Sequence, residues 1–83
     1  MKLTVKYFAS IREALGTGRE TVETSAAMVQ DLRAELVARG GAYAVSLAPG
    51  RAVRAALNQE MVDGQAVLSD GAEVAFFPPV TGG

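Results

Sequence analysis

The chain has 83 residues, of which 49% are hydrophobic and 20% are charged, and its formal net charge is −1. This length and composition fit one globular domain with a single modest core, and the balanced charge does not favour a nucleic-acid partner. No apolar run approaches the roughly 18 residues of a membrane span. Lys6 interrupts the short apolar start, so the sequence predicts no signal peptide and the cytoplasm is the expected compartment.

The chain contains no cysteine and no histidine. Disulfide bridges, thiolate nucleophiles and the usual structural zinc sites are therefore excluded. A histidine general base and a Ser-His-Asp triad are excluded for the same reason. The groups left for chemistry are carboxylates, lysines, hydroxyls and the chain termini, a set that does not favour a self-contained enzyme.

Residues 2–8, "KLTVKYF", alternate between apolar and polar side chains and predict a half-buried strand, although Phe8 falls on the polar face. Ser10 and Glu13 have the spacing of a capping box, which predicts a short helical turn over 11–15 that ends at a glycine. "RETVET", 19–24, predicts a second strand, polar on one side as edge strands tend to be.

One longer helix is predicted in "SAAMVQDLRAELVARGG", which begins at residue 25 and ends in two glycines. Thr24 or Ser25 is the expected N-cap, and Gly40–Gly41 are expected to end the helix. Its apolar face has helical spacing and consists of Met28, Val29, Leu32, Leu36 and Val37. Residues 42–50 are predicted to be an irregular loop that tucks Tyr43, Val45 and Leu47 onto the core.

The last part of the chain predicts strands and turns. "RAVRAAL", 51–57, alternates, and "NQ" turns the chain into a brief "EMV" strand. "EVAFF", 73–77, is the last strand, which Pro78 ends because proline cannot donate to a sheet. With one helix of useful length, the simplest two-layer arrangement is an α+β fold in which a sheet packs across that helix.

Phe8 and Phe77 end the first and last predicted strands, on the faces that the alternation leaves polar. Either one alone could be covered by the loop at 40–50 or the turn at 10–15, and single exposed apolar side chains are common. Together they favour an exposed apolar patch that marks a partner surface. Met61 is a weaker third member, for which ordinary core packing is an equal alternative.

The last six residues read "PPVTGG". Two prolines favour an extended backbone, and six residues span about 20 Å at full extension. Gly82 and Gly83 lack a Cβ, so they can enter a channel too narrow for other residues. The α-carboxylate is ionised at neutral pH and must be activated, for example as an acyl-adenylate, before a nucleophile can take its carbonyl.

"KLTVKYFASIREALG", "AALNQEMV" and "LSDGAEVAFFPPVTGG" closely resemble the small, sulfur-carrying subunits of molybdopterin synthase, which are ubiquitin-like β-grasp proteins. The resemblance covers essentially the whole chain and is most specific over 74–83. It implies an α+β, ubiquitin-like β-grasp fold with a mixed sheet packed on one main helix. The implied organisation is a β-grasp domain at 1–77 and a flexible, extended tail at 78–83.

The resemblance also implies a function. An E1-like adenylating enzyme would use ATP to adenylate the Gly83 carboxylate, and a persulfide sulfur donor would convert it to a thiocarboxylate. The tail would then enter the large synthase subunit and give its sulfur to cyclic pyranopterin monophosphate, two transfers forming the dithiolene. The expected complex is a heterotetramer of two small and two large subunits, in which this chain is not an enzyme alone.

The family's functional positions match a defined set of residues here. Gly82 and Gly83 would deliver the reactive carboxylate, and this chain would bind no cofactor and no metal itself. Docking to the partner would use Phe8, Met61, Phe77, Pro78, Pro79, Val80 and Thr81. Arg12, Arg51 and Arg54 could pair with acidic groups of partners, but solvated surface charge is the favoured interpretation.

Three other functions stay open at the level of sequence. The chain could carry sulfur for another pathway, such as thiazole synthesis for thiamine, although "FFPPVTGG" fits the molybdopterin branch better. It could be a ubiquitin-like modifier that forms isopeptide bonds with lysines. It could also be a plain interaction module with a disordered end, since disorder concentrates at chain termini.

Overall fold

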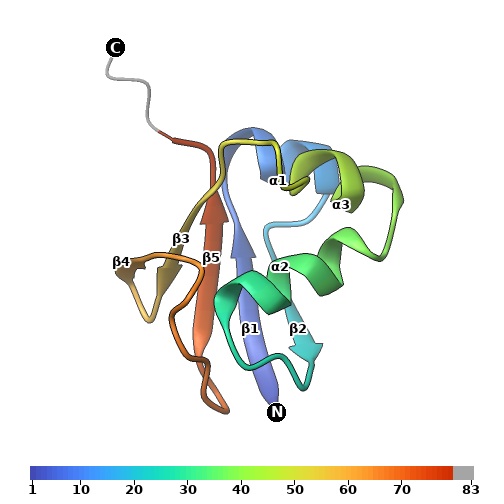
Figure 1. The fold of residues 1–83 in the computed structure, drawn as a ribbon. Coiled ribbons are helices and arrows are strands. Elements are labelled where there is room, and N and C mark those ends of the chain that lie inside the picture. The colour runs from blue at the N-terminus through green and yellow to red at the C-terminus, as the bar shows by residue number, and fades with distance from the viewer. Residues whose placement is uncertain (80–83) are drawn as a thin grey trace.

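A computed structural model describes residues 1–79 as a five-stranded mixed sheet with three helices (Figure 1). The strand order is β2-β1-β5-β3-β4, in which β1 and β5 are parallel and all other neighbours are antiparallel. The elements in chain order are β1 (Lys2–Tyr7), α1 (Ala9–Leu15), β2 (Arg19–Glu23), α2 (Val29–Val37), α3 (Gly41–Ser46), β3 (Arg54–Leu57), β4 (Glu60–Val62) and β5 (Glu73–Phe77).

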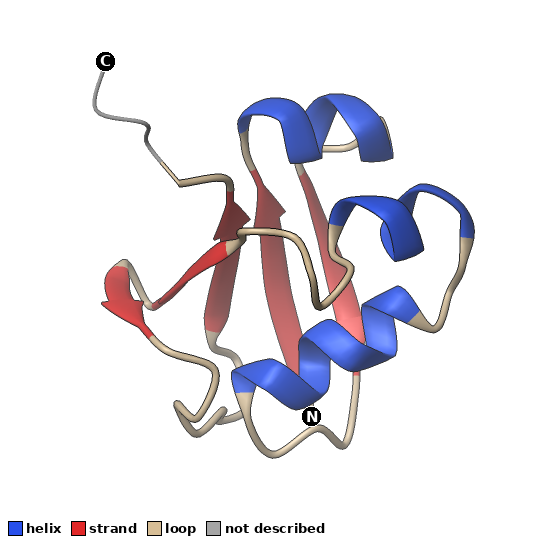
Figure 2. Ribbon diagram, turned by 45° about the horizontal axis from the view of Figure 1, so that its top comes forward, coloured by secondary structure: helices blue, strands red, loops and turns tan. Residues whose placement is uncertain are grey.

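The helices cover one face of the sheet, and the core lies between the two layers (Figure 2). The two central strands and α2 supply most of the core, and their inward side chains are almost fully buried. These side chains are Leu3, Val5 and Tyr7 of β1, Val74 and Phe76 of β5, and Val29, Leu32 and Leu36 of α2. The predicted α+β class, the alternation of the first and last strands and the edge position of β2 are thereby confirmed.

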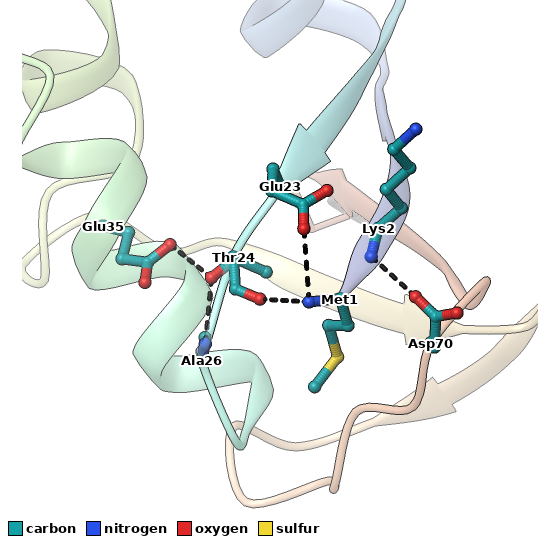
Figure 3. A network of polar contacts seen from close by, with 7 residues as sticks. All are labelled: Met1, Lys2, Glu23, Thr24, Ala26, Glu35 and Asp70. Atoms are coloured by element: carbon teal, nitrogen blue, oxygen red, sulfur yellow. Dashed lines mark hydrogen bonds and ion pairs between the residues drawn. The ribbon is translucent and has the colours of Figure 1, made fainter.

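α2 begins four residues later than the predicted start at Ser25. Thr24 does not cap it, because the Thr24 hydroxyl accepts a hydrogen bond from the Ala26 N–H and donates to Glu35, which fixes the chain in a turn (Figure 3). The backbone at Ala27 and Val29 bonds instead to Leu68 and Ala66 of a distant loop. The first turn is held by the Asp31 carboxylate, which accepts from the Met28 N–H at 3.2 Å.

The prediction of an irregular loop over 42–50 is wrong, because residues Gly41–Ser46 form the short helix α3. Tyr43 is half-buried against the core and Leu47 is fully buried, at the four-residue spacing of one helical face. Val45 does not tuck inward, since it lies on the opposite side of this helix and is 61% exposed.

A polar network joins α3 to the sheet. The Glu20 carboxylate of β2 accepts hydrogen bonds from the Tyr7 and Tyr43 hydroxyls, at 2.8 and 2.7 Å, and from Arg39 at 2.8 Å. Burial acts to raise the pKa of the Glu20 carboxyl, but the hydrogen bonds from Arg39, Tyr43 and Tyr7 hold this pKa below its ordinary value. Burial, and then the bond to Glu20, raise the pKa of the Tyr7 hydroxyl.

Three smaller expectations differ from the structure. α1 begins at Ala9, two residues before its predicted start at residue 11. Phe8 is its N-cap and no side chain caps it, so the predicted Ser10 capping box is absent. The Phe8 N–H donates to the Phe76 carbonyl, so the chain stays extended beside β5 up to the first residue of α1. β3 starts at Arg54 instead of residue 51.

None of the described helices is long and apolar enough to span a bilayer.

Candidate functional site

The face of the sheet opposite the helices carries the candidate site. Strand alternation and pairing register decide which residues lie there. Lys6 of β1 pairs with Ala75 of β5, and Ala75 pairs with Ala56 of β3. Ala56 in turn pairs with Met61 of β4. These four residues form one row across the sheet, on the face away from the core.

Phe8 and Phe77 adjoin one another on this face. Tyr7 pairs with Phe76 in the parallel register, so the next residues along the two strands, Phe8 and Phe77, are neighbours. Phe8 is 46% exposed, as predicted, and caps α1 with an extended backbone. Phe77 is half-buried, so the expectation that it is open to a partner holds only in part. The pairing thus brings two aromatic residues to the same end of the sheet.

Met61 lies on the same face and is 57% exposed, which settles its place as surface and not core. Between it and Phe77 the strands carry small side chains, since Ala56 is half-buried and Ala75 is 8% exposed. We call Phe8, Ala56, Met61, Ala75 and Phe77 the sheet patch. The exposed side chains of Phe8 and Met61, with the half-buried Phe77 and the alanines between them, present an apolar surface of the kind that marks a partner site.

Basic side chains lie beside the sheet patch at two places. Arg54 pairs with Phe77 across β3 and β5, and Arg19 pairs with Lys6 across β1 and β2. Lys6 is bound to Glu73 by an ion pair of 3.1 Å. Arg19 and Arg54 are exposed and make no ion pair within residues 1–79. Unpaired positive charge therefore lies beside Phe77 and beside Lys6, although exposed charges of this kind contribute little by themselves.

The predicted tail starts directly at the sheet patch. β5 ends at Phe77, and Pro78 and Pro79 follow it, both half-buried. The four remaining predicted site residues, Val80, Thr81, Gly82 and Gly83, lie outside the described residues. The structure thus brings Phe8, Met61, Phe77 and the two prolines to one side of the molecule, and it does not test the roles assigned to them.

A second feature, beside Pro78, was not expected from the sequence. A cavity of about 280 Å³ lies there, lined in part by Ser10, Ser46 and Arg51. The helical spacing of Tyr43 and Leu47 would have revealed α3, but no motif links its last residue, Ser46, to residues 10 and 51. Within the described part of the chain, no group of three Asp, Glu, His or Cys side chains could hold a metal ion.

Comparison with known proteins places this chain among small proteins of similar length. The model of the ThiS family matches residues 5–83. A protein of Escherichia coli (strain K12) named molybdopterin synthase sulfur carrier subunit is 42% identical, with 98% of this chain and 99% of the relative covered. The protein of the same name from Haemophilus influenzae is 36% identical over the same shares of the two chains.

Solved structures agree with the fold. Small archaeal modifier protein 1 of Haloferax volcanii superposes with a TM-score of 0.76 and 25% identity, covering 95% of this chain and 98% of the other. A chain in the complex of subunits 1 and 2 of the molybdopterin-converting factor of Helicobacter pylori gives a TM-score of 0.69 and 27% identity, with both chains covered completely. The β-grasp architecture expected from the sequence is confirmed.

Proposed function

This chain belongs to the ThiS family, and on that premise we propose that it is the sulfur-carrying small subunit of molybdopterin synthase. The observation that carries the proposal is the near-complete coverage of a molybdopterin synthase sulfur carrier subunit at 42% identity. The chain therefore acts as a sulfur carrier in molybdenum cofactor biosynthesis. The absence of cysteine is compatible with this role because the sulfur would be bound at the chain terminus.

The proposed chemistry takes place at the Gly83 carboxylate. An E1-like enzyme joins it to AMP with loss of pyrophosphate from ATP, which makes the carbonyl an electrophile. The outer sulfur of a persulfide donor then displaces AMP and forms an acyl disulfide, and a thiol reductant cleaves its S–S bond to leave a terminal thiocarboxylate and the donor thiol. The terminal sulfur is finally transferred to cyclic pyranopterin monophosphate. ATP belongs to the activating enzyme, and this chain binds no cofactor or metal of its own.

The proposed partner for transfer is the large synthase subunit, in a heterotetramer with two copies of each chain. The two-subunit complex of the Helicobacter pylori relative supports this pairing. The arrangement of the sheet patch also supports it, because Phe77 is continuous with Pro78 and Pro79. A partner that receives the last residues in a narrow channel would also lie near Phe8 and Phe77, so docking and delivery use one side of the molecule.

Intact mass spectrometry tests the proposal. After incubation with ATP, the activating enzyme and a sulfur donor, the full chain is expected to exchange one terminal oxygen for sulfur. A chain that lacks Gly83 serves as the control, and it should fold normally but neither gain sulfur nor support molybdopterin formation. Molybdopterin formation by the truncated chain would disprove the carrier function.

A protein modifier is the second candidate, because small archaeal modifier protein 1 has the same fold at 25% identity. Cell digests would then contain branched peptides in which Gly83 is joined to lysine side chains. A carrier for thiamine thiazole synthesis is distinguished by co-purification, which would recover thiazole synthase instead of the large synthase subunit. Recovery of the large subunit and an absence of branched peptides are the results expected here.

A further inference from the structure

The cavity beside Pro78 is formed by three separate parts of the chain. Ser10 and Ile11 come from α1, Ser46 ends α3, and Arg51 and Val53 belong to the segment that leads into β3. α1 and α3 lie at the end of the molecule where the chain leaves β5 (Figure 1). A protein that binds the tail would therefore lie at the same end of the molecule as this cavity.

Ser46 is the most buried polar group of the cavity. The residue is 7% exposed, and its hydroxyl has no hydrogen-bond partner within residues 1–79. No fully buried side-chain oxygen in this range lacks a partner, so the Ser46 hydroxyl keeps some exposed surface, and Ser46 lines the cavity. A hydroxyl placed in this way is available to a ligand at little cost in side-chain entropy, because burial already restricts its rotamer.

Arg51 supplies the charge. Its Nε donates to the Val45 carbonyl at 3.2 Å, and its own carbonyl accepts from Arg33 at 3.0 Å, so both ends of the residue are held. The two terminal nitrogens of the guanidinium have no acidic partner within residues 1–79. They form the fork that binds a carboxylate through two parallel hydrogen bonds.

The lining of the cavity selects its occupant. Two hydroxyls and one guanidinium donate hydrogen bonds, and no aspartate or glutamate lines the cavity. The rest of the wall is apolar and includes Ile11, Val53 and Pro78. A group with a short apolar stem and an anionic end matches both parts, which is the chemistry of an acidic side chain.

We propose that this cavity receives an acidic side chain of the large synthase subunit, whose carboxylate binds Arg51 and Ser46. The inference rests on the proposed function. The cavity adds a polar, orienting contact beside the apolar sheet patch. Because Pro78 lines it, filling the cavity would fix the direction in which the tail leaves the sheet.

The affinity of the purified full chain for the large subunit, measured by calorimetry, tests this inference. Arg51→Gln is expected to weaken binding by about 10- to 100-fold, the range for hydrogen bonds to a charged group. Ser46→Ala should weaken it by about 2- to 10-fold. Lys2→Gln is the matched control, because it removes one positive charge at the other end of β1 and should leave the affinity unchanged.

Alanine scanning of acidic residues on the large subunit should find one whose loss costs nothing further when Arg51 is already Gln. A cooperative thermal unfolding transition of Arg51→Gln confirms that the variant is folded. Wild-type affinity of this variant would overturn the inference while the carrier function stood. Tighter binding would also overturn it, since Arg51 would then oppose docking. Failure of the wild-type chain to gain sulfur would instead refute the proposed function.

Discussion

Met61 gives the clearest test that the sheet patch is a docking surface. Full burial of a methionine side chain contributes about 1.5–3 kcal/mol, and 57% of Met61 is still exposed in the free chain. Docking that covers the remainder would therefore contribute about 0.9–1.7 kcal/mol. Met61→Ala is expected to weaken binding to the large subunit by about 4- to 16-fold.

Val67→Ala is the matched control for this experiment. Val67 is 72% exposed, but it lies in the loop that bridges to Met28 and is not part of the sheet patch. Calorimetry should show an unchanged affinity for Val67→Ala, and both variants should keep the free energy of unfolding within about 0.5 kcal/mol. Equal losses of affinity for the two variants, or none for Met61→Ala, would refute the assignment of the sheet patch as the docking surface.

Three further predictions follow from burial and hydrogen bonding. Phe77→Ala should weaken docking less than Met61→Ala, because the half-buried Phe77 has less surface left to cover, and chemical denaturation should show that it lowers the free energy of unfolding by about 1–2 kcal/mol. Arg33→Ala should lower the free energy of unfolding by about 1.5–3 kcal/mol, since Arg33 donates to the carbonyls of Leu47, Ala48 and Arg51. Because the pKa of Glu20 is lowered on folding, its contribution is present above the ordinary carboxyl pKa and is lost as the pH falls through the folded value. Thermal unfolding of Glu20→Gln from neutral to acid pH should show a less stable protein with a flatter pH dependence, and an unchanged profile would contradict the role of Glu20.

The central strands could be predicted because alternate residues along each strand lie on opposite faces of the sheet. Leu3, Val5 and Tyr7 alternate with polar residues, and the structure buries all three. Phe8 and Phe77 were singled out because each breaks the polar face of its strand, and both do lie on the open side of the sheet. Met61 could not be placed in advance, because the three residues of β4 are too few for alternation to show which side is buried.

The errors occur where contacts between distant residues decide the local structure. The first predicted turn of α2 is lost because the chain before Val29 bonds to residues 66–68. α3 is six residues long and is held by Tyr43 and Leu47, a contact with the core that propensity alone does not reveal. The cavity beside Pro78 was not predicted because Ser10, Ser46 and Arg51 have no common spacing.

The parallel pairing of β1 with β5 has a consequence for folding. Val5 and Val74 pair in the middle of the sheet although nearly the whole chain separates them. Contacts of such sequence separation close the largest loop and are expected to form late. Phe8 and Phe77 come together only when this pairing is complete, so a chain whose synthesis stopped before β5 would not present their surface. Docking through this surface would therefore select chains in which the pairing of β1 with β5 is complete.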